Sequence, residues 1–203
     1  MTRTETVRPP GRPPAATRQQ VLERALHHYL RGRRVDVQAI AAELGVGRTT
    51  IYRWFGSREA LIGEVLFEAS EPLLWESRRN AKGRGARVLL DTFDRFNRIL
   101  ADSPALRRFV EAERDTALRI ITSGAGTLQP RIVASIQEVI DEEVRAGRYE
   151  PPVDTSTLAY AIVRLAEAFL FNDAAAGMRG DVDRLREVEA ALLAVPTPDK
   201  TGR

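Results

Sequence analysis

The chain has 203 residues, 43% of them hydrophobic and none of them cysteine, with a formal net charge of +3. This composition can bury a core, and the lack of cysteine excludes disulfide bonds and thiolate metal sites. No apolar run approaches the roughly 18 residues of a membrane span, and the polar, proline-rich N-terminus has no secretory signal. We therefore expect a cytoplasmic protein without a membrane segment.

The charge is unevenly distributed along the chain. Residues 1–63 contain eleven arginines and five acidic residues, a net charge of +6, whereas the remaining 140 residues have a net charge of −3. A basic segment joined to a mildly acidic body is typical of a protein that binds phosphates, because neutralising them releases counterions. A charged surface that only solvates the protein would give the same count, so this feature alone leaves both interpretations open.

Residues 1–16 are expected to form a basic flexible arm, because they contain four prolines and show no hydrophobic periodicity. Arg12 is a candidate for a DNA minor groove, whose negative potential attracts arginine. The alternative is a disordered leader without a DNA contact. A first helix is expected to follow, from Thr17 as its N-cap to about Leu30.

The segment from residue 37 to residue 61 has the pattern of a helix-turn-helix. An apolar stripe at positions i, i+3, i+4 and i+7 predicts a short helix, with Asp36 as its N-cap. The stripe consists of Val37, Ile40, Ala41 and Leu44. Gly45 follows, where a residue without a Cβ can adopt the left-handed conformation that ends a helix. A second short helix follows the turn, and its polar outer face indicates an anionic partner.

These residues resemble the DNA-binding domain of the TetR family of bacterial transcription regulators. The resemblance covers roughly residues 17–63 and has three motifs at fixed spacing: Leu44-Gly45-Val46, Thr50-Ile51-Tyr52-Arg53-Trp54-Phe55 and Ser57-Arg58-Glu59-Ala60-Leu61. The sequence departs from the family pattern at Arg58, where lysine is usual, and at Trp54, where histidine is common. The resemblance implies that the second helix of the motif enters the major groove of DNA.

The resemblance also implies which side chains contact DNA. The candidates for base edges are Gln38, Arg48 and Thr49, and Arg48 can donate two hydrogen bonds to guanine. The candidates for phosphates are Thr50, Tyr52, Arg53 and Arg58. Trp54 and Arg12 complete the set, and the contact that Trp54 makes is left open.

The rest of the chain is expected to be helical, without strand-like alternation. A linking helix begins at Ser57, and Pro72 is expected to kink or end it. Five further helices are expected, over residues 88–100, 105–121, 130–146, 155–172 and 181–195. We therefore predict an all-α fold of about nine helices. It comprises a three-helix helix-turn-helix DNA-binding domain at residues 17–63, a helical ligand-binding and dimerisation domain at residues 64–195 and a tail at residues 196–203.

The helix over residues 155–172 is the most apolar of the body, with apolar residues on more than one side. Its second buried surface belongs either to the core of the same chain or to another copy. In the TetR family the last two helices of two subunits pack as a four-helix bundle, which implies a homodimer through the last two long helices. Two heads related by a twofold axis would address a palindromic operator in double-stranded DNA.

The resemblance further implies a small-molecule effector bound in the body. Apolar candidates for its pocket are Trp75, Phe93, Phe96 and Phe109, and polar candidates are Arg164, Glu167 and Asn172. Aromatic residues at helical spacing can equally form core, and Arg164 with Glu167 can be an exposed pair. The stretch from Arg164 to Asn172 also resembles the ligand domain of QsdR-type regulators, a subfamily associated with lactone degradation, which implies a lactone or acyl ligand.

These features predict a sequence-specific transcriptional regulator, in the simplest form a repressor that a small apolar or amphipathic ligand releases from its operator, with no cofactor. One alternative is a ligand-independent, weakly specific DNA-coating protein. An enzyme is the other, but the sequence has no cysteine nucleophile, glycine-rich phosphate loop or metal-ligand spacing. The adjacent His27 and His28 cannot share a helix face, so no metal site is expected there.

Overall fold

The structure is a computed structural model that describes residues 16–171 and 181–195, and all its regular elements over these ranges are helices. The all-α prediction is therefore confirmed. In chain order the helices are α1 (Arg18–Leu30), α2 (Val37–Leu44), α3 (Arg48–Phe55), α4 (Arg58–Asn80), α5 (Ala86–Asp102), α6 (Pro104–Ala112), α7 (Arg114–Thr122), α8 (Leu128–Arg145), α9 (Thr155–Phe171) and α10 (Val182–Leu192). The expected arm, apart from Ala16, and the expected tail lie outside the described residues.

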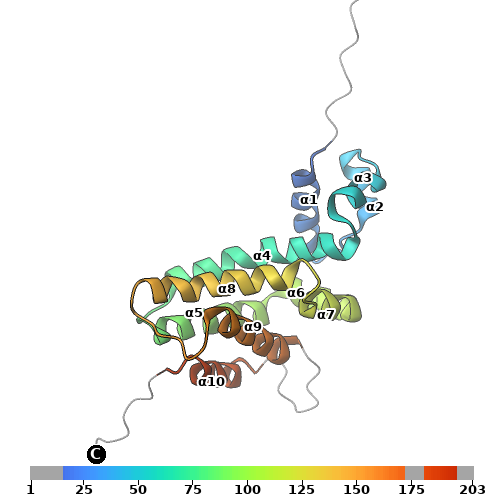
Figure 1. Cartoon of the computed structure of the whole chain (residues 1–203). Coiled ribbons are helices and arrows are strands. Elements are labelled where there is room, and N and C mark those ends of the chain that lie inside the picture. The colour runs from blue at the N-terminus through green and yellow to red at the C-terminus, as the bar shows by residue number, and fades with distance from the viewer. Residues whose placement is uncertain (1–15, 172–180, 196–203) are drawn as a thin grey trace, which may run out of the picture.

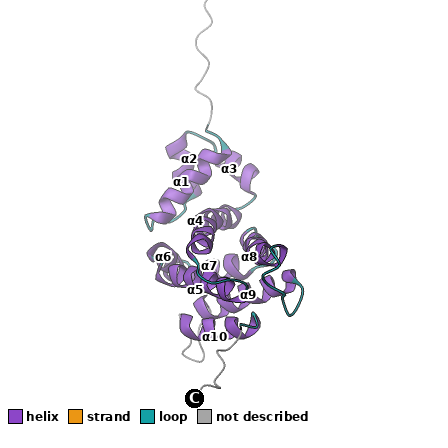
Figure 2. Cartoon of the chain, turned by 90° about the vertical axis from the view of Figure 1, so that its left-hand side faces the viewer, coloured by secondary structure: helices purple, strands orange, loops and turns teal. Residues whose placement is uncertain are grey.

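Helices α1 to α3 form a small head at one end of the long helix α4, and the other helices form the body (Figure 1). Helix α4 contacts α1 and α3 in the head, and α5, α7 and α8 in the body. Helices α9 and α10 pack on the side of the body that is remote from the head (Figures 1 and 2). No helix within the described ranges has the length and apolarity to cross a membrane.

The local signals in the head act as the sequence predicts. The hydroxyl of Thr17 accepts a hydrogen bond from the backbone N–H of Gln20, and the side-chain Oε1 of Gln20 accepts one from the backbone N–H of Thr17, which completes a capping box. A carboxylate oxygen of Asp36 accepts hydrogen bonds from the first turn of α2. Gly45 ends α2 at φ +65°, in the left-handed region that favours glycine. Together these caps fix where α2 ends and α3 begins.

Two expectations about where the body helices end were wrong. Helix α4 continues through Pro72 to Asn80, because it packs against α5 and α8 over much of its length and this burial outweighs the hydrogen bond that proline removes. The single helix expected over residues 105–121 is interrupted at Glu113, where φ is −138°, so α6 and α7 are separate helices. The described chain therefore has ten helices rather than nine.

The hydrophobic core of the head is continuous with that of the body. One cluster of buried residues joins α1, α2 and α3 to α4, α6, α7 and the start of α8. It includes Val21, Ile51 and Leu61 from the head side and Leu106 and Ile120 from the body. A second cluster fills the distal body between α4, α5, α8 and α9. A displacement of α6 or α7 would therefore disturb the packing of the head directly.

A buried carboxylate fastens the distal ends of α4, α5 and α8 together. Glu143 is only 1% exposed. It accepts hydrogen bonds from the guanidinium groups of Arg78 and Arg148, and from the backbone N–H of Gly85 at 3.0 Å. The hydrogen bonds from Arg148, with further help from Gly85 and Arg78, lower the pKa of Glu143 to about 2 although burial opposes this.

We expect Glu143→Gln to lower the free energy of unfolding at pH 7 by about 3 kcal/mol, because two arginines lose their buried counter-charge. The native state holds the Glu143 carboxylate ionised while the unfolded chain protonates it more readily. This stabilisation is therefore complete above about pH 4.5 and is lost as the pH falls toward about 2. Urea unfolding of both proteins across this range measures the effect.

The control for this prediction is Glu142→Gln. Glu142 has a side chain that is 38% exposed, and it contacts only Arg78 of the same group, so its replacement should cost less than about 1 kcal/mol. Equal losses for Glu142→Gln and Glu143→Gln would contradict the assignment of a special role to the buried carboxylate.

Candidate nucleic-acid interface and ligand cavity

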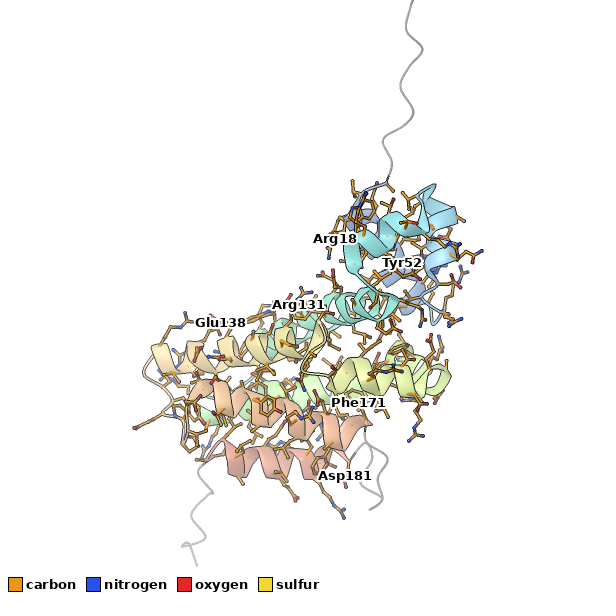
Figure 3. The ribbon with its side chains drawn as sticks, turned by 45° about the vertical axis from the view of Figure 1, so that its right-hand side comes forward. Arg18, Tyr52, Arg131, Glu138, Phe171 and Asp181 are labelled. Carbon is orange, nitrogen blue, oxygen red and sulfur yellow. The ribbon has the colours of Figure 1, made fainter. Side chains whose placement is uncertain are left out.

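Helix α3 has one buried and one exposed face. Ile51 and Phe55 are almost fully buried in the core of the head. The opposite face is formed by exposed polar and basic side chains, among them Tyr52, which is 44% exposed (Figure 3). The other exposed residues of this face are Arg48, Thr49 and Arg53. The apolar positions thus fix the rotation of α3 and direct its basic side chains outward.

Arg48 and Arg53 have no ion-pair partner among the residues that the structure describes. Helix α3 contains no acidic residue that could neutralise them. Gln38 on α2 is also exposed. This surface therefore offers two uncompensated guanidinium groups beside hydroxyl and amide groups, which is the chemistry that phosphates and base edges require.

The remaining candidates for DNA contacts lie differently. Thr50 and Trp54 are half-buried, and Trp54 packs against the core of the head. The backbone carbonyl of Trp54 accepts a hydrogen bond from Arg18, which also contacts Glu64 on α4 and lies over the Phe55 ring (Figure 3). Arg18 therefore holds the ends of α1, α3 and α4 together. Arg12 lies outside the described residues.

Arg58 has its guanidinium group inside the protein. Its Nη1 and Nη2 donate hydrogen bonds of 2.7 Å to the two carboxylate oxygens of Glu113, and its Nε donates to the carbonyl oxygen of Val35 at 2.8 Å. Its side chain is only 18% exposed. The hydrogen bonds with Arg58 also lower the pKa of Glu113. Because its donors are engaged in this way, we leave Arg58 out of the proposed DNA-binding face.

The Arg58–Glu113 pair connects the head to the body at a specific point. Arg58 begins α4, Val35 precedes α2, and Glu113 lies at the break between α6 and α7. Sequence reasoning did not find this pair, because residues 55 positions apart come together only in the folded chain. The break between α6 and α7, which the sequence also did not indicate, is the place where the carboxylate reaches Arg58.

An apolar cavity of about 150 Å³ lies where the head meets the body. Its walls come from α1, α4, α5, α6, α7, α8 and α9, with Tyr29 and Leu30 at the end of α1 contributed by the head. Most lining side chains are aliphatic or aromatic. The polar ones are Tyr29, Ser70, Asn97, Ser103, Gln129 and Glu167. A concave apolar site with a few polar groups is typical of a site for a small ligand.

Three of the candidate ligand residues line this cavity: Phe93, Phe96 and Glu167. Trp75 instead lines a groove at the distal end of the body, and Phe109 packs edge-on against Tyr29 with ring centroids 6.3 Å apart. Arg164 is not part of the wall, and Asn172 lies outside the described residues. The sequence analysis missed Tyr29, Asn97 and Gln129, because these side chains come to line one cavity only when seven helices pack together.

The described residues form an all-helical fold, and the second helix of its helix-turn-helix has a basic face without counter-charges among them. This architecture defines a helix-turn-helix DNA-binding protein. Residues 30–65 match the family model for bacterial regulatory proteins of the tetR family. Residues 84–194, more than half of the chain, match the model for the tetracyclin repressor-like C-terminal domain. The chain belongs to the TetR family of transcriptional regulators, which confirms the prediction from the sequence.

Two solved structures are similar to this chain. The transcriptional repressor QsdR of R. erythropolis, from the TetR family, is 28% identical, with a TM-score of 0.82 over 89% of this chain and 96% of QsdR. The TetR family repressor AlkX of Dietzia sp. strain DQ12-45-1b, implicated in biodegradation of n-alkanes, is 25% identical, with a TM-score of 0.59 over 88% of this chain and 96% of AlkX. A comparison with curated protein sequences found no match.

We expect Arg58 and Glu113 to stabilise the fold as a coupled pair. Arg58→Ala and Glu113→Ala should each lower the free energy of unfolding by about 1 to 3 kcal/mol, and the double variant should lose clearly less than the sum, because each single change leaves a half-buried charge without its partner. Denaturant unfolding of the four proteins gives the coupling energy.

The pair formed by Glu68 and Arg131 provides the comparison for this cycle. Both side chains are 42% exposed and their charged atoms are 3.6 Å apart, so the same cycle there should give a coupling energy below about 1 kcal/mol. Additive losses at Arg58 and Glu113 would show that the two side chains do not act as a unit.

Proposed function

We propose that the protein is a sequence-specific repressor that binds a palindromic operator as a homodimer and releases it when a small molecule occupies the cavity between head and body. The observation that carries the DNA-binding part is the outer face of α3, where Arg48 and Arg53 have no counter-charge within the described chain. QsdR and AlkX are both described as repressors, which supports repression here. The family and these relatives are regulators rather than enzymes.

On the proposed DNA-binding face the residues divide into two groups. Arg48, Thr49 and Gln38 are assigned to base edges, and Arg48 to guanine through two hydrogen bonds. Thr50, Tyr52 and Arg53 are assigned to phosphates, which fix the position of the head without reading sequence. Two further candidates remain part of the proposal: Trp54, through its half-buried ring, and Arg12, through the minor groove.

The position of the cavity supports coupling between ligand and operator. Tyr29 and Leu30 belong to α1 of the head, whereas Leu106 and Ile121 line the cavity from α6 and α7. Glu113, between α6 and α7, binds Arg58 at the start of α4. A ligand that prefers a changed position of α6 or α7 would therefore bias the orientation of the head and lower operator affinity by its differential affinity for the two states.

The dimer is proposed to form through the outer faces of α9 and α10. Tyr160 on α9 is 51% exposed and Val188 on α10 is 40% exposed, which are large values for apolar side chains on a protein surface. A contact between two copies would cover them. In a twofold arrangement the two heads would reach half-sites about one helical turn apart.

We expect the double variant Tyr160→Arg, Val188→Arg to be a monomer of about the chain mass, 22.6 kDa, while the unchanged protein sediments as a dimer. Each substitution places a like charge on both sides of a twofold contact. Val153→Arg is the control, since Val153 is 46% exposed but precedes α9. If the double variant remained a dimer, the interface would have to lie on another surface of the protein.

We expect selection from random duplex DNA at near-physiological salt to enrich a palindrome with two half-sites. Arg48→Ala should then lose preference at one base position of each half-site and weaken binding by about 1 to 3 kcal/mol. Arg53→Ala should weaken all sequences alike and reduce the slope of log affinity against log salt by about one unit.

Arg145→Ala is the control for the loss of one positive charge, because Arg145 lies at the distal end of α8 (Figure 1). It should leave both affinity and sequence preference unchanged. An unaltered operator preference in Arg48→Ala would remove that residue from base reading. Binding without any enriched sequence would instead favour a weakly specific DNA-coating protein.

A further inference from the structure

Over the described part of the chain, the wall of the cavity between head and body has no positively charged side chain. None of the lining residues in the described chain is lysine, arginine or histidine. Most of them are aliphatic or aromatic, including Phe93, Phe96 and Ile162. An anion that entered this cavity would give up its hydration without meeting a cation in the wall, and such a transfer is strongly unfavourable.

One wall of the cavity instead carries a carboxylate. Glu167 is 7% exposed, and its Oε1 accepts a hydrogen bond of 3.1 Å from the amide of Gln129. Its Oε2 accepts one of 2.7 Å from Arg164, which is 43% exposed and also donates to the carbonyl oxygen of Thr122. Arg164 therefore binds Glu167 from the solvent side, outside the cavity wall. It balances the charge of Glu167 and is not among the residues that line the cavity.

A second acidic side chain lies behind the cavity wall. Glu189 on α10 is fully buried, and its Oε1 accepts a hydrogen bond of 3.0 Å from the side-chain amide of Asn97, which lines the cavity. Its Oε2 has no hydrogen-bond partner among the residues that the structure describes. Burial, with a smaller contribution from Asp94, raises the pKa of Glu189 to about 7, so above neutral pH this side of the cavity also carries a negative charge.

The hydrogen bonds already formed determine what the polar part of the wall can offer. The amide of Gln129 donates to Glu167 and to the carbonyl oxygen of Thr122, which leaves its own carbonyl oxygen as an acceptor. The hydroxyl of Ser70 donates to the carbonyl oxygen of Leu66 and so presents lone pairs. The hydroxyl groups of Tyr29 and Ser103 also line the cavity and can donate, so the wall can pair with an uncharged polar group of either kind.

We infer that the cavity takes an uncharged, mainly apolar molecule, and that it rejects carboxylate anions of the same shape. This selectivity concerns the cavity to which the proposed function assigns the effector, and it rests on that assignment. A carboxylate would lie near Glu167 and Glu189 with no cation in the wall, whereas an alcohol would leave no unpaired charge.

Benzyl alcohol and benzoate are suitable probes, because they share size and ring and differ in charge. An apolar cavity of about 150 Å³ in another protein holds benzene, which sets the size of the ring. We expect calorimetric titration of the full chain at pH 8 to show that benzyl alcohol binds at least ten times more tightly than benzoate. In Glu167→Gln this ratio should fall at least threefold, because the nearest negative charge is removed.

Two variants keep the test specific to the cavity. Glu68→Gln removes a negative charge from α4 at a side chain that is 42% exposed, and it should leave the ratio unchanged. Ala166→Leu adds three carbon atoms to the cavity wall and should weaken benzyl alcohol at least tenfold. Thermal unfolding checks that this variant is folded, and Ala69→Leu is the substitute if it is not.

The charge selectivity is overturned if benzoate binds as tightly as benzyl alcohol, or if neither probe binds. It is also overturned if Ala166→Leu and Ala69→Leu, both folded, bind benzyl alcohol unchanged. Release of operator DNA is measured separately with the same probes. Binding of benzyl alcohol without DNA release would leave the selectivity intact and contradict only the proposed role of the cavity as effector site.

Discussion

Helix α4 is the constraint on which the rest of the structure depends, because its apolar side chains are shared between the head and the body. Leu61, Ile62 and Val65 are buried in the cluster that contains the core of the head, and Leu74 is buried in the cluster of the distal body. A helix that is buried at both ends cannot rotate about its axis without exposing one of the two surfaces. The head is therefore held in a defined orientation, and a change in that orientation requires a coordinated change in the body.

The charged residues fall into two groups, paired and unpaired, which the net charge does not distinguish. In the body, acidic groups such as Glu113 and Glu143 are matched by arginines at hydrogen-bond distance, so these charges stabilise the fold. On the outer face of α3, Arg48 and Arg53 have no such match within the described residues. The +6 charge of residues 1–63 is thus only partly available to a partner, and part of what is available lies on the helix that the motif predicts.

The parts of the molecule that the sequence predicts are those that local rules determine. Thr17, Asp36 and Gly45 act within one turn of the chain, so the helix-turn-helix could be placed from its caps and its apolar stripe. The continuation of α4 through Pro72 and the partnership of Arg58 depend on packing between distant segments. The cavity lining depends on seven helices at once, which is why Phe93 was predicted and Tyr29 was not.

The location of Tyr29 gives the cavity its significance for regulation. Were the cavity confined to the body, a ligand could influence DNA binding only by moving α4, whose two ends are fixed by burial. Because α1 supplies Tyr29 and Leu30 to the wall, and because Phe109 of α6 packs against Tyr29, a ligand contacts the head and the body together. The relative position of head and body therefore determines the shape of the binding site. Because the ligand contacts the head directly, it can bind two head orientations with different affinity, and no further residues are needed to transmit the effect.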